Sequence, residues 1–339
     1  MVAKGGHILA TLKRKLNSYK QFNLYLLIVL VLFGAFMFTG CSGDPHTKLD
    51  KKARAHEAES STLSKLTVYF STCNGYMVPI TYPLNKGDEP VRTAAEILLE
   101  GPKTEYLFRT IPKGTRLKDC YVSDGTAFID FTKEFNKLSN SKETSKAVKS
   151  LCLTMGSIPG VDTVQVLIDG KIIDEIHGIP MGQMLKHSWV NYSGSGYTEN
   201  KYVVYYVDSS GLYMVPVTYA SETGDSIPQK AIERLVTGPA DSCLTSPVWP
   251  GTRLLNLKIE KGLATVDLSE QAIGYGGGTT AESLFVKSIL LTLGQFSDIK
   301  AVQILIEGDK VESLPEGTQV GVPLDPIRDA NPYLQNGVK

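Results

Sequence analysis

The chain has little of what metal centres and nucleophilic active sites are built from. It holds five histidines and five cysteines in 339 residues. No two histidines stand at the short spacing of a metal-ligand pair on one element. The histidines are His7, His46, His56, His177 and His187. The sequence therefore predicts no metal and no cofactor.

The chain as a whole also has no net charge. The whole chain carries 35 basic and 35 acidic residues. The first 40 residues hold five of the bases and no acid, so removal of that segment leaves a net charge of about −5. No basic cluster is evident from the sequence, and we expect no nucleic-acid partner.

Motifs for phosphate and nucleophile chemistry are lacking too. The sequence has no GxSxG elbow and no dinucleotide fingerprint. A glycine cluster at 274–278 leads into Thr279 without the lysine that a phosphate loop requires.

What the chain has instead is a long internal repeat. Residues 76–82 (YMVPITY) return 137 positions later as residues 213–219 (YMVPVTY), and 114–117 (GTRL) return as 251–254. Near the end the offset grows by one, from 165–170 (QVLIDG) to 303–308 (QILIEG). We therefore predict two copies of one domain, at residues 64–176 and 201–314. Chemistry intrinsic to that domain should occur in both copies.

Residues 1–40 have the pattern of an export signal, with bases followed by an unbroken apolar run from Leu24 to Phe38. The sequence Phe38-Thr39-Gly40-Cys41 resembles the lipobox of bacterial lipoproteins. That resemblance implies cleavage before Cys41 and attachment of a lipid to it. An uncleaved signal anchor is the alternative. Both interpretations place the rest of the chain on the extracytoplasmic face of a membrane.

Three further segments are predicted to lie outside the domains. Residues 41–63 are polar and short of aromatics, which predicts a flexible tether. Residues 177–200 form a linker with SGSG at 193–196, although Trp189 and Tyr192 suggest that its first half docks on a domain. The C-terminal tail, residues 315–339, has no periodicity and is assigned no element.

Each copy is interpreted as β-β-α-β-β-α-β, an α+β fold with helices packed on one face of a mixed sheet. In copy one the strands are expected near 66–70, 76–82, 115–122, 126–131 and 161–169, and the helices near 90–100 and 142–155. Pro79 and Pro216 predict that the second strand of each copy lies at a sheet edge or carries a bulge. Thr279 and Glu282 predict a capping box at the second helix of copy two.

The cysteines outside the leader are not duplicated. Cys73, Cys120, Cys152 and Cys243 are replaced in the other copy by serine, leucine or tyrosine. We therefore predict that they are small buried hydrophobic residues. An exported protein could nonetheless oxidise one pair to a disulfide, and the sequence leaves that open.

The polar residues that do repeat are Glu96/Glu233, Arg116/Arg253, Asp130/Asp267, Lys149/Lys287 and Gln165/Gln303. One interpretation makes Glu96 and Asp130 the paired carboxylates of a glycosidase. The other is structural, with the aspartates ending strands by accepting backbone N–H bonds and the arginines pairing with carboxylates. We favour the structural one, and so predict no catalytic residue and no enzyme.

The residues now support a family resemblance. The pieces at 68–70 (VYF), 99–102 (LEGP), 114–116 (GTR), 127–130 (AFID) and 164–170 (VQVLIDG) resemble the GerMN domain. Two such domains behind a lipobox resemble sporulation and germination lipoproteins of endospore-forming bacteria. One departure is Thr237, which stands where copy one has Glu100. The resemblance implies a fold similar to the ring-building modules of secretion systems.

The resemblance also implies a function. Proteins of this kind are exported from the mother cell, whose membrane faces the forespore. There they support assembly of the channel complex between the two cells through protein contacts. The alternative is a protein that binds or remodels the peptidoglycan of the spore envelope, and a ligand carrier is a third possibility. The sequence leaves open the contacting face, the oligomeric state and the relative orientation of the domains.

Overall fold

The computed structural model describes residues 63–181, 184–185, 189–194, 199–222, 224, 226–274 and 278–333. The predicted leader, Cys41 and nearly all of the predicted tether lie outside these residues. All described residues belong to one compact unit of the chain. Within the ranges given, no helix is long and apolar enough to cross a membrane.

The first domain contains both predicted helices. Its main elements are β1 (Lys65–Ser71), β2 (Met77–Pro83), α3 (Pro90–Glu100), β3 (Leu117–Ser123), β4 (Thr126–Phe131), the 3-10 helix η1 (Lys133–Lys137), α4 (Ser141–Gly156) and β5 (Thr163–Ile168). Short strands follow as β6 (Lys171–Ile172), β7 (Glu175–Ile176), β8 (Ile179–Pro180) and β9 (Met184–Leu185).

The second domain repeats this order. Its elements are β10 (Lys201–Asp208), β11 (Met214–Ala220), α5 (Ile227–Thr237), β12 (Leu244–Thr245), β13 (Leu254–Glu260), β14 (Leu263–Leu268), η2 (Glu270–Ile273), α6 (Gly278–Gly294) and β15 (Ala301–Ile306). The α+β class and the predicted order β-β-α-β-β-α-β are thereby confirmed in both copies.

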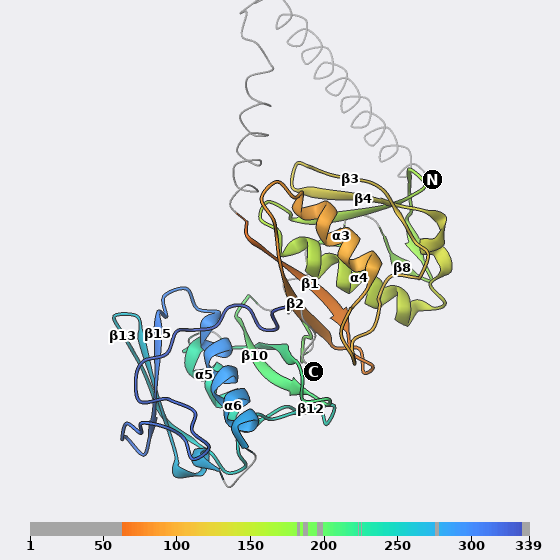
Figure 1. Ribbon diagram of the computed structural model, residues 1–339. Helices are drawn as coiled ribbons and strands as arrows, with labels where there is room; N and C mark the ends of the chain where they lie inside the picture. The colour runs from red at the N-terminus through yellow and green to blue at the C-terminus, as the bar shows by residue number, and fades with distance from the viewer. Residues whose placement is uncertain are drawn as a thin grey trace, which may run out of the picture. The chain divides into compact units, whose positions relative to one another are not determined.

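Each domain has one more layer than the predicted single sheet with helices on one face. In the first domain β1 and β2 form a separate two-stranded sheet, and β3, β4 and β5 form the mixed sheet. Helix α3 contacts both β1 and β3, and α4 contacts both β1 and β5. The helices therefore lie between the hairpin and the mixed sheet. The second domain has the same layers, with α5 and α6 between β10 and β13–β15 (Figure 1).

The strands that hold the prolines, β2 and β11, are edge strands, whereas β10 lies between β11 and β12. Pro79 pairs with Tyr69, and Pro216 pairs with Tyr205. A proline lacks the N–H for a second ladder, so neither β2 nor β11 can become the middle of a wide regular sheet. Both strands are nevertheless buried at six consecutive residues, and β2 and β11 contact each other.

The mixed sheets of the two domains have the same strand directions and a bulge at the equivalent position. β3 runs antiparallel to β4, and β4 runs parallel to β5. The register between β3 and β4 shifts between Leu117 and Asp119, and that between β13 and β14 shifts between Leu254 and Asn256. A bulge of this kind bends the outer strand and disturbs its exposed edge.

Helix capping differs from the sequence prediction. The box expected at Thr279 and Glu282 is wrong, because α6 already begins at Gly278 and Glu282 is buried. The Glu282 carboxylate accepts hydrogen bonds from the N–H groups of Glu316 (2.7 Å) and Thr318 (3.2 Å). It therefore fastens the C-terminal tail to the second domain. In copy one, Asn140 caps α4 by accepting from the Glu143 N–H at 3.0 Å.

The linker and the tail repeat each other in structure. β9 pairs with β5 through Met184 and Val164, and the tail residue Leu324 forms a bridge with Val302 of β15. The predicted linker thus holds strands in its first half. The tail has isolated bridges but no named strand, and Val320 in it is fully buried. Both segments continue the domain that precedes them.

Candidate functional site

The two domains meet through their hairpins and through two chain segments that we call arms. The first arm is residues 189–194, after the first domain, and the second arm is residues 328–333, after the second. In the first arm, the Asn191 Oδ1 accepts a hydrogen bond from the Met77 N–H at 2.8 Å. Its Nδ2 donates to the carbonyl of Met77 at 2.8 Å and to that of Pro216 at 2.7 Å. Asn191 therefore ties β2 to β11.

The second arm makes the reciprocal contact. The Asn331 Oδ1 accepts from the Met214 N–H at 2.9 Å, and its Nδ2 donates to the carbonyls of Met214 and Pro79, both at 2.9 Å. Each asparagine thus binds backbone groups of both β2 and β11, including a carbonyl of a proline that has no N–H to donate. The carboxamide can do so because it offers an acceptor and two donors from one planar group.

Beyond the asparagines, each arm pairs with the other domain's hairpin. The Thr218 N–H donates to the Val190 carbonyl at 3.1 Å, and the Ser193 N–H donates to the Thr218 carbonyl at 2.9 Å. On the second arm, the Tyr333 N–H donates to the Thr81 carbonyl at 2.7 Å, and its ring stacks on Tyr82. The outer edges of β2 and β11 are therefore both occupied.

Each arm packs against its own domain through a small apolar cluster. Val190 packs with Met77 and Leu153, and Ala330 packs with Met214 and Leu291. Tyr69 and Tyr205 pack against these clusters from the first strand of each hairpin. Burial raises the pKa of both tyrosine hydroxyls, that of Tyr205 to about 12. The junction between the domains is thus apolar on both sides of the asparagine pair.

The turn of each hairpin reaches the other domain. The Tyr76 hydroxyl donates to the Asp241 carboxylate at 2.6 Å, and the Tyr213 hydroxyl donates to the Glu105 carbonyl at 2.8 Å. The hydrogen bond from Tyr76 is the main cause that lowers the pKa of Asp241. The two tyrosines are equivalent in the repeat, so the two domains contact each other reciprocally.

A polar cleft of about 620 Å³ opens beside the first of these contacts. Its walls are the hairpin turn of domain one, the first arm and the loop after α5. Tyrosine rings and short polar side chains line it, among them Asn74, Tyr76, Lys149, Tyr192, Ser193, Tyr219, Asp241 and Ser242. Both domains contribute side chains to this cleft.

The repeated aspartates and glutamines have structural partners. Asp130 accepts the Gly170 N–H at 2.9 Å, and Asp267 accepts the Gly308 N–H at 2.8 Å. These bonds hold the tight turn after β5 and β15, where both central residues have positive φ and glycine fits best at the second. This part of the sequence interpretation is confirmed.

Buried glutamines hold the segments that cover the mixed sheets. The Gln165 Nε2 donates to the Met181 carbonyl at 3.3 Å, and the Gln303 Nε2 donates to the Val320 carbonyl at 2.9 Å. Each also donates to the carbonyl of the following strand residue at 3.0 Å. The repeated glutamines thus join the linker to β5 and the tail to β15.

Glu96 and Asp130, the carboxylate pair of the disfavoured glycosidase interpretation, do not converge. Ile129 and Phe131 are fully buried in the core that the helices share, whereas the half-buried Asp130 alternates with them and points to the other face of the sheet. Glu96 is exposed on α3, on the helix side. The two groups therefore do not face each other across a cleft, as glycosidase chemistry would need.

The repeated cations differ from expectation. The Arg116 and Arg253 backbones donate to Thr132 and Ser269 at 3.2 and 3.0 Å. Among the described residues neither arginine forms the expected ion pair with a carboxylate, so that detail is wrong. Lys149 is exposed, and burial lowers the pKa of its half-buried counterpart Lys287.

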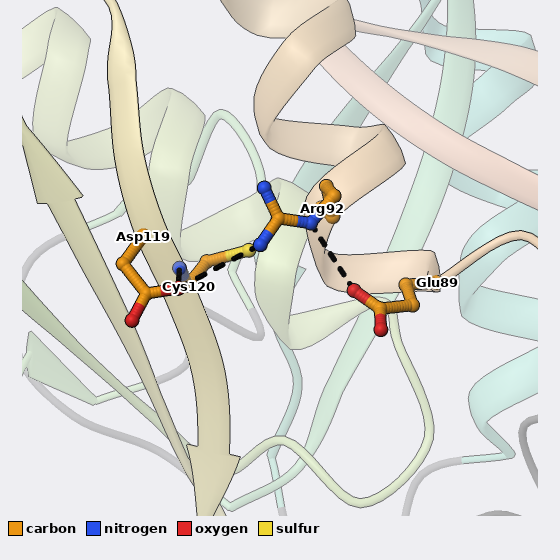
Figure 2. Close-up of polar contacts among 4 residues, drawn as sticks. All are labelled: Glu89, Arg92, Asp119 and Cys120. Atoms are coloured by element: carbon orange, nitrogen blue, oxygen red, sulfur yellow. Dashed lines mark hydrogen bonds and ion pairs between the residues drawn. The ribbon is translucent and has the colours of Figure 1, made fainter.

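One thiol lies in a cluster of charges (Figure 2). The Arg92 guanidinium donates to Glu89 at 3.2 Å and lies 3.6 Å from the Asp119 carboxylate, which accepts the Cys120 N–H at 2.8 Å. Burial raises the pKa of the Cys120 thiol, against the opposing effect of Arg92. A protonated, buried thiol is the opposite of an activated nucleophile.

The same four positions carry no charge in the second domain. The equivalents of Glu89, Arg92, Asp119 and Cys120 are Ser226, Gln229, Asn256 and Leu257. The cluster is thus local to one copy and is not part of the shared fold.

The four described cysteines divide into two classes. Cys120 and Cys152 are buried, as predicted, with 9% and 1% of their surface exposed. The prediction is wrong for the other two, because Cys73 is exposed and Cys243 is partly exposed. All four are free thiols in the structure.

Sequence reasoning missed a basic surface of the first domain. Arg109, Lys113, Lys137 and Lys146 line a second cleft, of about 390 Å³, together with Glu143. Lys113 lies in the loop before β3, Lys137 ends η1 and Lys146 lies on α4, so these cations come from separate elements. The regular spacing of Lys133, Lys137, Lys142, Lys146 and Lys149 was the available signal. In the part of the chain that the structure describes, no group of histidine, cysteine and acidic side chains is arranged to hold a metal.

Comparisons with known proteins agree with this architecture. Residues 67–174 and 203–312 match the model of a family described as Germane, sporulation and spore germination. The chain is 29% identical over 295 residues to the spore germination protein GerM of Bacillus subtilis (strain 168), covering 81% of this chain and 80% of that protein. The solved tandem GerMN domains of the sporulation protein GerM from Bacillus subtilis superpose with a TM-score of 0.60 at 23% identity, over 79% of this chain and 98% of that one.

Proposed function

The chain belongs to the Germane family of sporulation and spore germination proteins, and we propose that it is a membrane-anchored, extracytoplasmic factor that supports assembly of the channel complex between mother cell and forespore. In this proposal Cys41 carries the lipid anchor, residues 42–63 span the distance from the membrane, and the two domains bind protein components of the complex.

The observation that carries the proposal is the reciprocal asparagine junction. Asn191 and Asn331 hold β2 and β11 at a fixed separation. We propose that two domains held in this way act as one rigid body, which presents the exposed side chains of both domains together. A rigid body with two similar faces suits a protein that orders other subunits, because little conformational entropy is lost when it binds.

The repeated polar side chains support the same proposal. Asp130, Asp267, Gln165 and Gln303 are all engaged by backbone groups of their own domain. Residues that the duplication retained are therefore used to build the domain. A function that both copies share is then expected from their surfaces.

The test separates rigidity from the mere presence of two domains. In sporulating cells of an endospore-forming host, Asn191→Ala combined with Asn331→Ala should lower the yield of heat-resistant spores and the co-purification of channel components with the tagged chain. Asn136→Ala, at an exposed position of η1, is the matched control. Normal assembly by a chain that keeps only one of the two domains would overturn the proposal.

A second candidate function is binding of peptidoglycan, and the cleft beside Tyr76 is the observation that favours it. Tyrosine rings and short polar groups line that cleft, and glycans are commonly held by such surfaces. Purified sacculi should then retain the chain, and Tyr192→Ala should abolish retention. Retention that survives Tyr192→Ala, or no retention of the unaltered chain, would exclude the cleft as a wall-binding site. Glu96→Gln and Asp130→Asn should leave retention unchanged, because neither residue lines the cleft.

A further inference from the structure

The two accessible cysteines come from different domains and lie at the same junction. Cys73 is in the turn of the β1–β2 hairpin, which the Thr72 N–H closes by donating to the Tyr76 carbonyl at 2.8 Å. Cys243 is in the loop after α5, where its N–H donates to the Asp241 carboxylate at 2.8 Å. The Tyr76–Asp241 hydrogen bond of 2.6 Å joins these two loops directly.

The reciprocal contact on the other side of the junction supports this placement. There the hairpin residue Tyr213 reaches Glu105, in the loop after α3. Each hairpin turn therefore meets the loop that follows the first helix of the other domain. Cys73 and Cys243 occupy these two elements on one side of the junction only.

The Cys73 thiol is close enough to contribute to the raised pKa of the Cys243 thiol. The pKa of the Cys243 thiol is raised first by its hydrogen bond to Asp241, then by burial, by the Asp241 charge and by the thiol of Cys73. Both cysteines lie in loops, outside strands and helices, so their backbones can adjust to the Cα separation of about 5.5 Å that a disulfide requires.

We infer that Cys73 and Cys243 are the two halves of a disulfide that links the domains once the chain is outside the cytoplasm. The inference rests on the extracytoplasmic location in the proposed function. Cys120 and Cys152 are too buried to compete, so accessibility selects one pair from four thiols.

The oxidant is an exchangeable disulfide, such as that of a thiol–disulfide oxidoreductase or oxidised glutathione. The Cys73 thiolate attacks one sulfur of this disulfide, which releases the first oxidant thiolate and leaves a mixed disulfide on Cys73. Cys243 gives up its proton, and its thiolate then attacks the Cys73 sulfur and releases the second. The two cysteines lose two electrons and two protons, and the oxidant gains both as two thiols.

Intact-mass spectrometry of the purified full-length chain tests the inference. A Cys41→Ser background removes the one cysteine that lies outside the described residues. After treatment with oxidised glutathione the chain should be lighter by about 2 Da, and proteolysis should give one linked peptide pair that contains residues 73 and 243. Reductant should reverse both changes.

Single substitutions provide the controls. Cys243→Ser should abolish the linked pair and leave glutathione on Cys73, whereas Cys152→Ser should leave the pair intact. Stable glutathione adducts on both Cys73 and Cys243 of the unaltered chain, without linkage, would show that the loops cannot meet and would overturn the inference. The result is independent of sporulation, so its failure would not touch the proposed assembly role, nor would loss of that role remove the disulfide.

Discussion

Asn191 and Asn331 play the same part in opposite directions. Each accepts a hydrogen bond from the methionine that begins the second hairpin strand of its own domain, and each donates to a proline carbonyl of the other domain. Pro79 and Pro216 have no N–H for pairing with a further strand, but their carbonyls accept the hydrogen bonds that join the two domains. The junction is a property of the duplicated chain and could not exist in a single copy.

Asn331→Ala should destabilise the protein more than Asn191→Ala. Asn331 is 7% exposed and Asn191 is half-buried, so water replaces the lost partner less easily at Asn331. Stranding the buried Met214 N–H should cost about 1–3 kcal/mol. Denaturant unfolding of the two variants gives the comparison, with Asn136→Ala as the control that should change nothing. Equal, negligible effects at both positions would contradict a junction held by these side chains.

Gln303→Leu should lower the free energy of unfolding by about 1–3 kcal/mol, because it leaves two buried carbonyls without their donor. Gln165→Leu should have an effect of the same order, since its bonds repeat those of Gln303. Gln319→Leu, at an exposed tail position, is the control. The prediction fails if Gln303→Leu and Gln319→Leu unfold at the same denaturant concentration.

Gly294→Ala should loosen the second arm. A Cβ at this position would lie 2.1 Å from the Ile327 carbonyl oxygen, so the backbone of the tail must move. Arg328 also donates to the Gly294 carbonyl. Overpacking of this kind costs about 1–3 kcal/mol. Hydrogen exchange of the Thr81 amide, which donates to the Asn331 carbonyl at 2.9 Å, should accelerate. Unchanged protection of that amide, as expected for the control Ser297→Ala, would count against tail docking at Gly294.

Stability should fall as the pH rises above about 10, the pKa of an unfolded tyrosine. Burial raises the pKa of Tyr69 and Tyr205 in the folded protein, so above that pH the unfolded chain binds fewer protons than the folded one. Lys287 acts with the opposite sign, because burial lowers its pKa. Comparison of Tyr205→Phe with the unaltered chain isolates the tyrosine.

Denaturant unfolding at about pH 8 and pH 11 should show a smaller loss of stability for Tyr205→Phe. Below about pH 9 the two proteins should have the same pH dependence, since the hydroxyl is then neutral in both states. An equal alkaline loss in both would mean that Tyr205 ionises freely in the folded protein.

Local repetition made most of the domain predictable. The pair Asp130/Asp267 was retained in the repeat, and its role in binding backbone N–H groups was predicted. Gln165 and Gln303 were seen to repeat, but the carbonyls that they bind were not predicted. The arms did not follow, because Asn191 and Asn331 stand in segments that share almost no other residue. Their partners are backbone groups of Met77, Pro79, Met214 and Pro216. A backbone partner cannot be recognised from the residue types in the sequence.

The helix start of α6 was misread for a related reason. The spacing of Thr279 and Glu282 fits a capping box. Glu282 instead accepts hydrogen bonds from the N–H groups of Glu316 and Thr318, which are distant in the sequence. A local pattern cannot anticipate a distant donor. The cysteines divide by their place in the fold, because Cys120 and Cys152 lie on β3 and α4, whereas Cys73 and Cys243 lie in loops.

The bulges in β3 and β13 and the arms on β2 and β11 have a joint consequence for how this protein can be built into something larger. The arms already fill the hairpin margins, and the bent outer strands of the mixed sheets are poor templates for another chain. Addition of a strand from a neighbour is therefore disfavoured at each of these four places. An array built through these four places would depend on contacts between side chains. Single surface substitutions could then change its geometry.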